Sequence, residues 1–139
     1  MAASPEATWR ALTAAVTGGS NRRAGRVYAR LVGATHVNIS GQPGTVGSTV
    51  AGFVVTAANQ PSELVLEGAH RFGIYRLGLY VDDLGDGASR LRAETNAAFI
   101  GLAGRIYKLF VIDSRAHVLL VRRMLRGIKG RAESEHSSA

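Results

Sequence analysis

Residues 62–99 read SELVLEGAHRFGIYRLGLYVDDLGDGASRLRAETNAAF, and their pattern determines the fold class of this chain. Turn-forming residues divide it at His70–Gly73 and Asp82–Gly87, and the segments between the turns are rich in Leu, Val, Tyr and Ala. Apolar and polar side chains alternate along the later segments, so one face of each is dry and the other carries arginines and glutamate. The pattern predicts antiparallel strands at 62–69, 73–83 and 88–99.

The flanking sequence adds helices and further strands. Ser4 and Pro5 are typical of a helix start, and they predict a helix over 5–17 that Gly18 ends. The chain is therefore expected to form an α+β domain, whose other elements are helices at 22–32 and 104–130 and strands at 34–39 and 47–57.

Composition limits the class of protein. The 139 residues are 46% hydrophobic and 19% charged, which suits one hydrophobic core and excludes a wholly disordered chain. There is no cysteine, so disulfides and thiolate chemistry are excluded. No apolar run approaches the roughly 18 residues of a membrane span, and no signal peptide is visible, so we expect a cytoplasmic protein. We assign 1–131 to a single domain and 132–139 to a disordered polar tail.

The net charge of +7 belongs to one segment. Residues 104–131 contain eight basic residues and one acid, Asp113, whereas the rest of the chain has nine of each sign. On the predicted helix the basic side chains fall opposite the apolar stripe, so we interpret them as a solvated face. Nucleic acid is disfavoured as a partner because no aromatic residue interleaves with the arginines.

Asp113 and His117 interrupt the apolar stripe of the predicted helix 104–130. They are four positions apart and therefore adjacent on a helix. Two interpretations stay open. The carboxylate orients a buried imidazole for structural reasons, or the pair is an acid/base dyad that faces a pocket. The apolar members of the stripe are Ile106, Phe110, Val121, Met124 and Ile128.

Five segments together resemble a known family: ASPEATWRAL (3–12), GSTVAGFVV (47–55), LEGAHRFGIYRLGLYV (66–81), SRLRAETNAAF (89–99) and GRIYKLFVIDSRAHVLLVRRML (104–125). In this order they resemble the START-like SRPBCC superfamily of actinobacterial type, which includes polyketide cyclase/dehydrase-like proteins. The resemblance implies a helix-grip fold. In that fold a curved antiparallel sheet wraps around the long C-terminal helix, and two short helices lie near the N-terminus.

The sequence departs from that family at its start. In the superfamily a strand precedes the segment that resembles SPEATWRAL, and here only Met1–Ala3 precede it. The family's first strand is therefore missing, and it would lie beside strand 88–99. We expect an open edge on that strand, which either residues upstream of Met1 or a second copy of the chain would cover, giving a homo-oligomer in the second case.

The resemblance also implies a cavity between the sheet and the C-terminal helix, and this gives two hypotheses for function. The first is binding of a small hydrophobic or amphipathic molecule. The alternative is a cyclase or dehydratase in which His117, oriented by Asp113, moves protons on the substrate. No metal or cofactor is expected, because the four histidines are scattered and no nucleotide-binding motif is present. The expected ligand-binding residues are His70, Tyr75, Phe110, Asp113, His117, Val121 and Met124.

Overall fold

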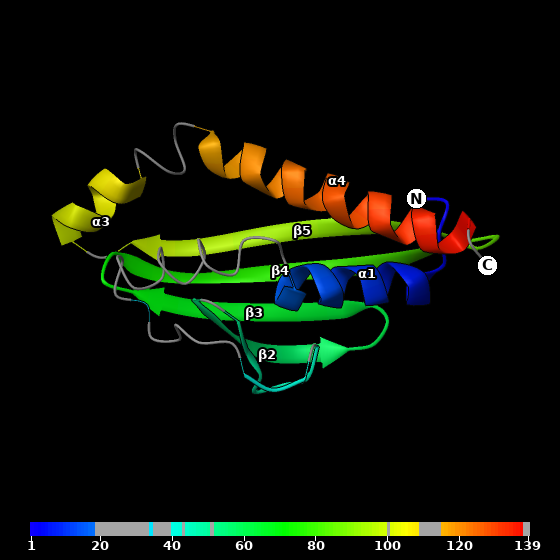
Figure 1. The fold of residues 1–139 in the computed structure, drawn as a ribbon. Helices are drawn as coiled ribbons and strands as arrows, with labels where there is room; N and C mark the ends of the chain where they lie inside the picture. Colours follow the sequence, from blue (N-terminus) through cyan, green and yellow to red (C-terminus); the bar gives the residue numbers. More distant parts are fainter. Residues whose placement is uncertain are drawn as a thin grey trace.

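The computed structural model describes residues 1–18, 34, 40–42, 44–50, 52–99, 101–108 and 115–137. It has an α+β fold, as the sequence predicts (Figure 1). In chain order the elements are α1 (Pro5–Gly18), β1 (Thr49–Val50), β2 (Phe53–Asn59), β3 (Glu63–His70), β4 (Gly73–Gly85), β5 (Ala88–Phe99), α3 (Gly101–Lys108) and α4 (Ala116–Ser137).

Helix α1 begins where the sequence predicts. The Ser4 hydroxyl oxygen accepts a hydrogen bond of 3.3 Å from the N–H of Ala7, so Ser4 is the N-cap. Pro5 takes the first helical position, where the missing N–H of proline has no partner to lose. The predicted helix over 5–17 is confirmed.

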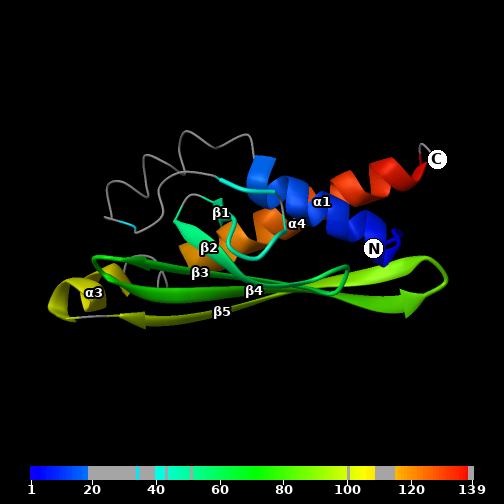
Figure 2. The same ribbon diagram turned by 90° about the horizontal axis from the view of Figure 1, so that it is seen from below.

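The five strands form one antiparallel sheet in which each strand pairs with the next along the chain. The register pairs Leu64 with Leu79, and apolar residues of neighbouring strands thereby come onto one face. Helices α1 and α4 lie on that face, which we call the inner face (Figure 2). The predicted strand 88–99 is confirmed, and those at 62–69 and 73–83 are confirmed to within two residues.

The hydrophobic core lies between the two helices and one end of the inner face. Leu12 of α1 and Ile128 of α4 are fully buried there. The Thr8 and Ser89 hydroxyls share a hydrogen bond of 2.7 Å, which satisfies two buried polar groups. Trp9 of α1 is 5% exposed and also belongs to this core.

The outer face of the sheet carries ion pairs among the charged side chains that the alternation places there. Arg92 donates to Asp82 through two hydrogen bonds of 2.7 and 3.1 Å and to Glu94 through one of 3.2 Å. Arg76 lies 3.7 Å from Glu67 on the neighbouring strand. All these side chains are at least one-third exposed, so the prediction of a solvated charged face is confirmed.

The prediction of a single strand over 47–57 is wrong. β1 ends at Val50 and β2 begins at Phe53, and Gly52 between them has φ +89°. Because glycine adopts positive φ without strain, the chain reverses there, and Val50 pairs with Phe53 in a tight hairpin. The segment therefore supplies two strands of the sheet instead of one.

The prediction of one continuous helix over 104–130 is also wrong. α3 ends at Lys108 and α4 begins at Ala116. The residue before α4, Arg115, has φ +61°, which a right-handed helix does not allow. Two separate helices replace the long one.

Helix α4 also ends later than predicted. The sequence predicts a disordered tail over 132–139, but α4 continues to Ser137. Ala132 is fully buried in the core, and the N–H of Ala2 donates to a Glu133 carboxylate oxygen at 3.4 Å. These contacts give the last turns a surface to pack on, and such packing is what stabilises most protein helices.

Two predicted elements fall outside the described residues. They are the helix at 22–32 and the strand at 34–39, of which only the buried Ala34 is described. None of the helices that the structure describes is long and apolar enough to span a membrane.

Candidate functional site

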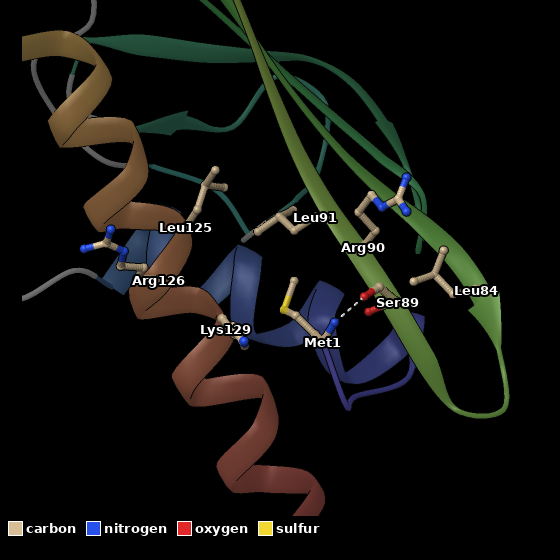
Figure 3. A pocket seen from close by; sticks show the side chains of 8 residues that line it. All are labelled: Met1, Leu84, Ser89, Arg90, Leu91, Leu125, Arg126 and Lys129. Carbon is tan, nitrogen blue, oxygen red and sulfur yellow. Dashed lines mark hydrogen bonds between the residues drawn. The ribbon is translucent and has the colours of Figure 1, made fainter. Parts of the chain in front are cut away.

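A groove lies between β5 and α4, at the end of the molecule where the two chain termini lie (Figure 3). Its volume is about 280 Å³, close to the lower end of the range of small-molecule sites. We call it the α4 groove. It is lined by Met1, Leu84, Ser89, Arg90, Leu91, Leu125, Arg126 and Lys129.

Backbone hydrogen bonds hold the first residue against β5 and shape this groove. The Met1 ammonium donates to the Ser89 carbonyl oxygen at 2.7 Å, and the Ser89 N–H donates to the Met1 carbonyl oxygen at 3.1 Å. The side chains of Met1, Leu91 and Leu125 lie in the space between β5 and α4 (Figure 3). The centre of the α4 groove is therefore apolar.

Three cations stand around this apolar centre. Arg90, Arg126 and Lys129 are exposed and line the groove, and the Lys129 ammonium lies 3.8 Å from a Glu133 carboxylate oxygen. Figure 3 shows the Arg126 guanidinium directed away from Leu91. Apolar contact in the middle and positive charge at the rim suit a ligand with an apolar body and an acidic group.

At the opposite end of the inner face four rings form what we call the aromatic cluster: Phe53, His70, Phe72 and Tyr75. The ring centroids of Phe53 and Tyr75 are 4.9 Å apart with an interplanar angle of 68°. The His70 ring lies 4.9 Å from that of Tyr75 and 5.7 Å from that of Phe72. Edge-to-face contacts of this kind add to the gain from burial alone. The cluster joins β2, β3, β4 and the turn between β3 and β4.

Gly68 makes room for the Tyr75 ring. The two residues are paired across β3 and β4, and a Cβ at Gly68 would lie 2.8 Å from the ring. The Tyr75 hydroxyl reaches Gly52, where a Cβ would lie 3.5 Å from the oxygen. The ring therefore occupies space that a side chain at position 68 would fill.

His70 is buried, with 8% of its surface exposed. The N–H of Phe72 donates to His70 Nδ1 at 3.1 Å. Burial lowers the pKa of His70 below its ordinary value of 6.5, and a hydrogen bond with the backbone opposes part of that shift. His70 is therefore neutral at pH 7 and is suited to hydrogen bonding more than to pairing with an anion.

The inner face of β5 connects the α4 groove with the aromatic cluster. Leu91 and Ala93 are half-buried, whereas Thr95 and Ala97 are exposed. Ala97 is paired with Tyr75 of the cluster. The inner face of β5 is therefore covered near Leu91 and open near Ala97. The six residue steps between these two positions span about 20 Å of strand.

Four of the predicted ligand-binding residues can be compared with the structure. His70 and Tyr75 are in contact, and His70 is the last residue of β3 and not part of the turn. Val121 and Met124 lie on α4 and are partly buried, and Met124 packs against the core. The structure therefore brings the first two together and places the other two on the helix that covers the sheet.

The other three predicted residues are not placed. Phe110 and Asp113 lie outside the described residues. His117 belongs to α4, but its side chain is not among those described. The proposed dyad of Asp113 and His117 stays a prediction.

Several residues of the α4 groove and the aromatic cluster are not predicted from the sequence. A single strand over 47–57 gives Phe53 no special position, and a ring in a turn such as Phe72 follows no periodic pattern. Leu91 carried a usable signal, since alternation already placed it on the dry face with Tyr75. Nothing in the sequence pattern pointed to Met1.

Within the described part of the chain, no three His, Asp or Glu residues are grouped so that they could hold a metal ion. No family model, curated protein or solved structure matches this chain.

Proposed function

We propose that this protein binds a small hydrophobic or amphipathic molecule between the inner face of the sheet and α4, as a START-like protein with a helix-grip fold. The order of elements supports the proposal. A helix, an antiparallel meander and a C-terminal helix follow one another, and α1 and α4 lie on the same side of the sheet. The wrapping of the sheet around α4 is part of the proposal.

The open half of the inner face is the observation that carries the proposal. Leu79 is fully buried on this face, yet Thr95 and Ala97 on the same face are exposed. Covering this part of the inner face with apolar surface lowers the free energy, because apolar groups are removed from water. A bound molecule would supply that surface.

The shape of the open wall favours an elongated ligand. Its apolar body would lie along the inner face of β5 from Leu91 to Ala97, over a length of about 20 Å. An acidic group at one end would meet the cations of the α4 groove, while the aromatic cluster would contact the other end. Long-chain fatty acids have this form.

The alternative function is proton-transfer catalysis of the cyclase or dehydratase type. Its support is that α4 includes position 117, which lies four and seven residues before Val121 and Met124 and so falls on the same helical stripe. Under this alternative His117→Leu abolishes turnover of a polycyclic ketone while apolar ligands still bind. Under the binding function the same change alters affinity only for ligands with a polar group.

Calorimetric titration with hexadecanoic acid and with a polycyclic ketone tests the binding function. Ala97→Phe fills the open wall, and we expect it to weaken binding about tenfold or more. Ala98→Phe is the matched control, because Ala98 is an exposed alanine next in the chain that points to the outer face. Equal affinities for the two variants, or no binding of either ligand by the unmodified protein, would contradict the proposal.

A further inference from the structure

Helix α3 turns a glycine toward the sheet and apolar side chains toward solvent. Gly104 packs so closely that a Cβ there would lie 2.6 Å from the Phe72 carbonyl oxygen. Leu102 and Ile106 are each two positions from Gly104, or about 200° around the helix, so they point away from the sheet. They are 74% and 51% exposed. A surface helix ordinarily has its apolar side chains on the buried side. In α3 the described apolar side chains Leu102 and Ile106 face solvent instead.

Cations accompany these apolar side chains. Arg105 is exposed on α3, and Arg71 is exposed in the turn between β3 and β4, directly before the Phe72 that contacts Gly104. The sequence of residues 68–75 and 96–108 contains no Asp or Glu. We call this surface the α3 tip, and it consists of Arg71, Leu102, Arg105 and Ile106.

The first turns of α4 repeat the same combination. Leu119 is 66% exposed. Helical spacing places Arg122, Arg123 and Arg126 one to two turns after it, on the side away from the buried stripe of α4, and Arg115 directly precedes the helix. All four are exposed: Arg115, Arg122, Arg123 and Arg126.

We propose that the α3 tip docks on the surface of an anionic lipid bilayer. Leu102 and Ile106 enter the boundary between headgroups and acyl chains, where apolar side chains of interfacial helices are buried. Arg71 and Arg105 pair with lipid phosphates, and the arginines of α4 add to the attraction toward the negative surface.

The exposed apolar residues favour a bilayer over nucleic acid. A phosphate backbone attracts arginines equally well, but it offers no apolar layer for Leu102 and Ile106. Single-stranded binding would use aromatic side chains among the cations as stacking platforms. The exposed side chains described on the α3 tip and around Leu119 include no aromatic ring.

Sedimentation of the full chain with vesicles tests this proposal. We expect binding to phosphatidylglycerol vesicles, little binding to phosphatidylcholine vesicles, and weaker binding as salt is added. The double variant Leu102→Ser with Ile106→Ser should weaken binding about tenfold or more. Val46→Ser is the matched control, because Val46 is 58% exposed and lies outside the α3 tip.

A charge variant separates the electrostatic contribution. Arg105→Gln should weaken binding to phosphatidylglycerol about fivefold. Arg10→Gln removes an exposed arginine from α1 and should leave binding unchanged. Because the altered side chains on α3 are exposed, circular dichroism should show that all variants fold.

A depth measurement locates the tip in the bilayer. The chain contains no cysteine, so Leu102→Cys carries a unique spin label. On phosphatidylglycerol vesicles the label should become accessible to oxygen and protected from a water-soluble relaxation agent. Three results would overturn the proposal: no binding to phosphatidylglycerol, binding that the double serine variant leaves intact, or binding to nucleic acid but not to vesicles.

Discussion

Two glycines in the strands of the sheet leave the space that two tyrosine rings occupy. Gly68 leaves space for Tyr75 on the inner face. Gly78 does the same for Tyr80 on the outer face, where a Cβ at position 78 would lie 2.7 Å from the Tyr80 hydroxyl. The Arg92 guanidinium lies 5.2 Å from the centre of the Tyr80 ring. Glycine in a strand interior thus marks a close approach on each face of the sheet.

The buried His70 should make stability depend on pH. Its pKa is lowered in the folded state, mainly by burial. The unfolded chain therefore binds more protons as the pH falls below the ordinary value of 6.5, and the free energy of unfolding should decrease in that range. Above that value the contribution of His70 to stability should be constant. Urea unfolding followed by circular dichroism from mildly acid to neutral pH measures this dependence.

His70→Gln should flatten the pH dependence, because an amide does not titrate in this range. An unchanged pH dependence in His70→Gln would mean that another group is responsible.

For individual residues, the sequence predicts where a side chain lies but not which side chains it contacts. Ser4 could be predicted as a cap because the cap depends on residues next to one another. Tyr75 could be placed on the dry face by alternation. The contact between His70 and Tyr75 could not, because it depends on the space that Gly68 leaves on the neighbouring strand.

Among the elements, α3 shows why periodicity alone was insufficient. The helical spacing from Ile106 to Ile128 is apolar except at Asp113 and His117, so it predicts a single helix. The two residues have different surroundings, since Ile106 is 51% exposed and Ile128 is fully buried. The close approach of Gly104 to the end of the sheet fixes α3 in an orientation that turns Ile106 outward.

Helix α4 is attached to the core mainly through its later turns. Ile128→Ala should lower the free energy of unfolding by about 2–5 kcal/mol, because it opens a cavity in the core. Val118→Ala, on the same helix but at a position that is 42% exposed, should change it by no more than about 0.5 kcal/mol. Urea unfolding of both variants measures the difference, and equal effects would mean that the packing of α4 is misplaced.

At the scale of the molecule, the edge of the sheet at β5 is largely unpaired among the described residues. Met1 pairs with Ser89 at the start of the strand. Over the rest of β5 the described residues supply backbone partners from β4 alone. Open strand edges are sites where a further strand adds.

We therefore expect self-association through β5 that increases with protein concentration. Ala93 lies four residues after Ser89 and so directs its N–H to the same outer edge. Ala93→Pro removes that donor without loss of a hydrogen bond to β4, and it should shift the equilibrium to the monomer. Analytical ultracentrifugation measures both forms. A monomer at every concentration would rule out association through this edge.

The side of the sheet that faces the helices could be predicted more easily than how much of it the helices cover. Alternation from Gly73 to Phe99 determined which side chains face inward, and the structure follows it. It could not show that α1 and α4, among the described elements, cover only part of that face. Coverage depends on where α4 begins, and the helical period of the apolar residues continues past Arg115, so it does not predict a break there.

The burial of Trp9 has a practical consequence. It is the single tryptophan of the chain, and its ring packs where a Cβ on Gly44 would lie 3.4 Å away. Indole fluorescence from this protein therefore comes from one place, where α1 meets the loop before β1. Figure 1 shows that α1 and α3 lie apart, so attachment of the α3 tip to vesicles should leave the emission maximum unchanged. Loss of the core should move that maximum to longer wavelength, and the colour of the emitted light thus distinguishes a protein that has docked from one that has unfolded.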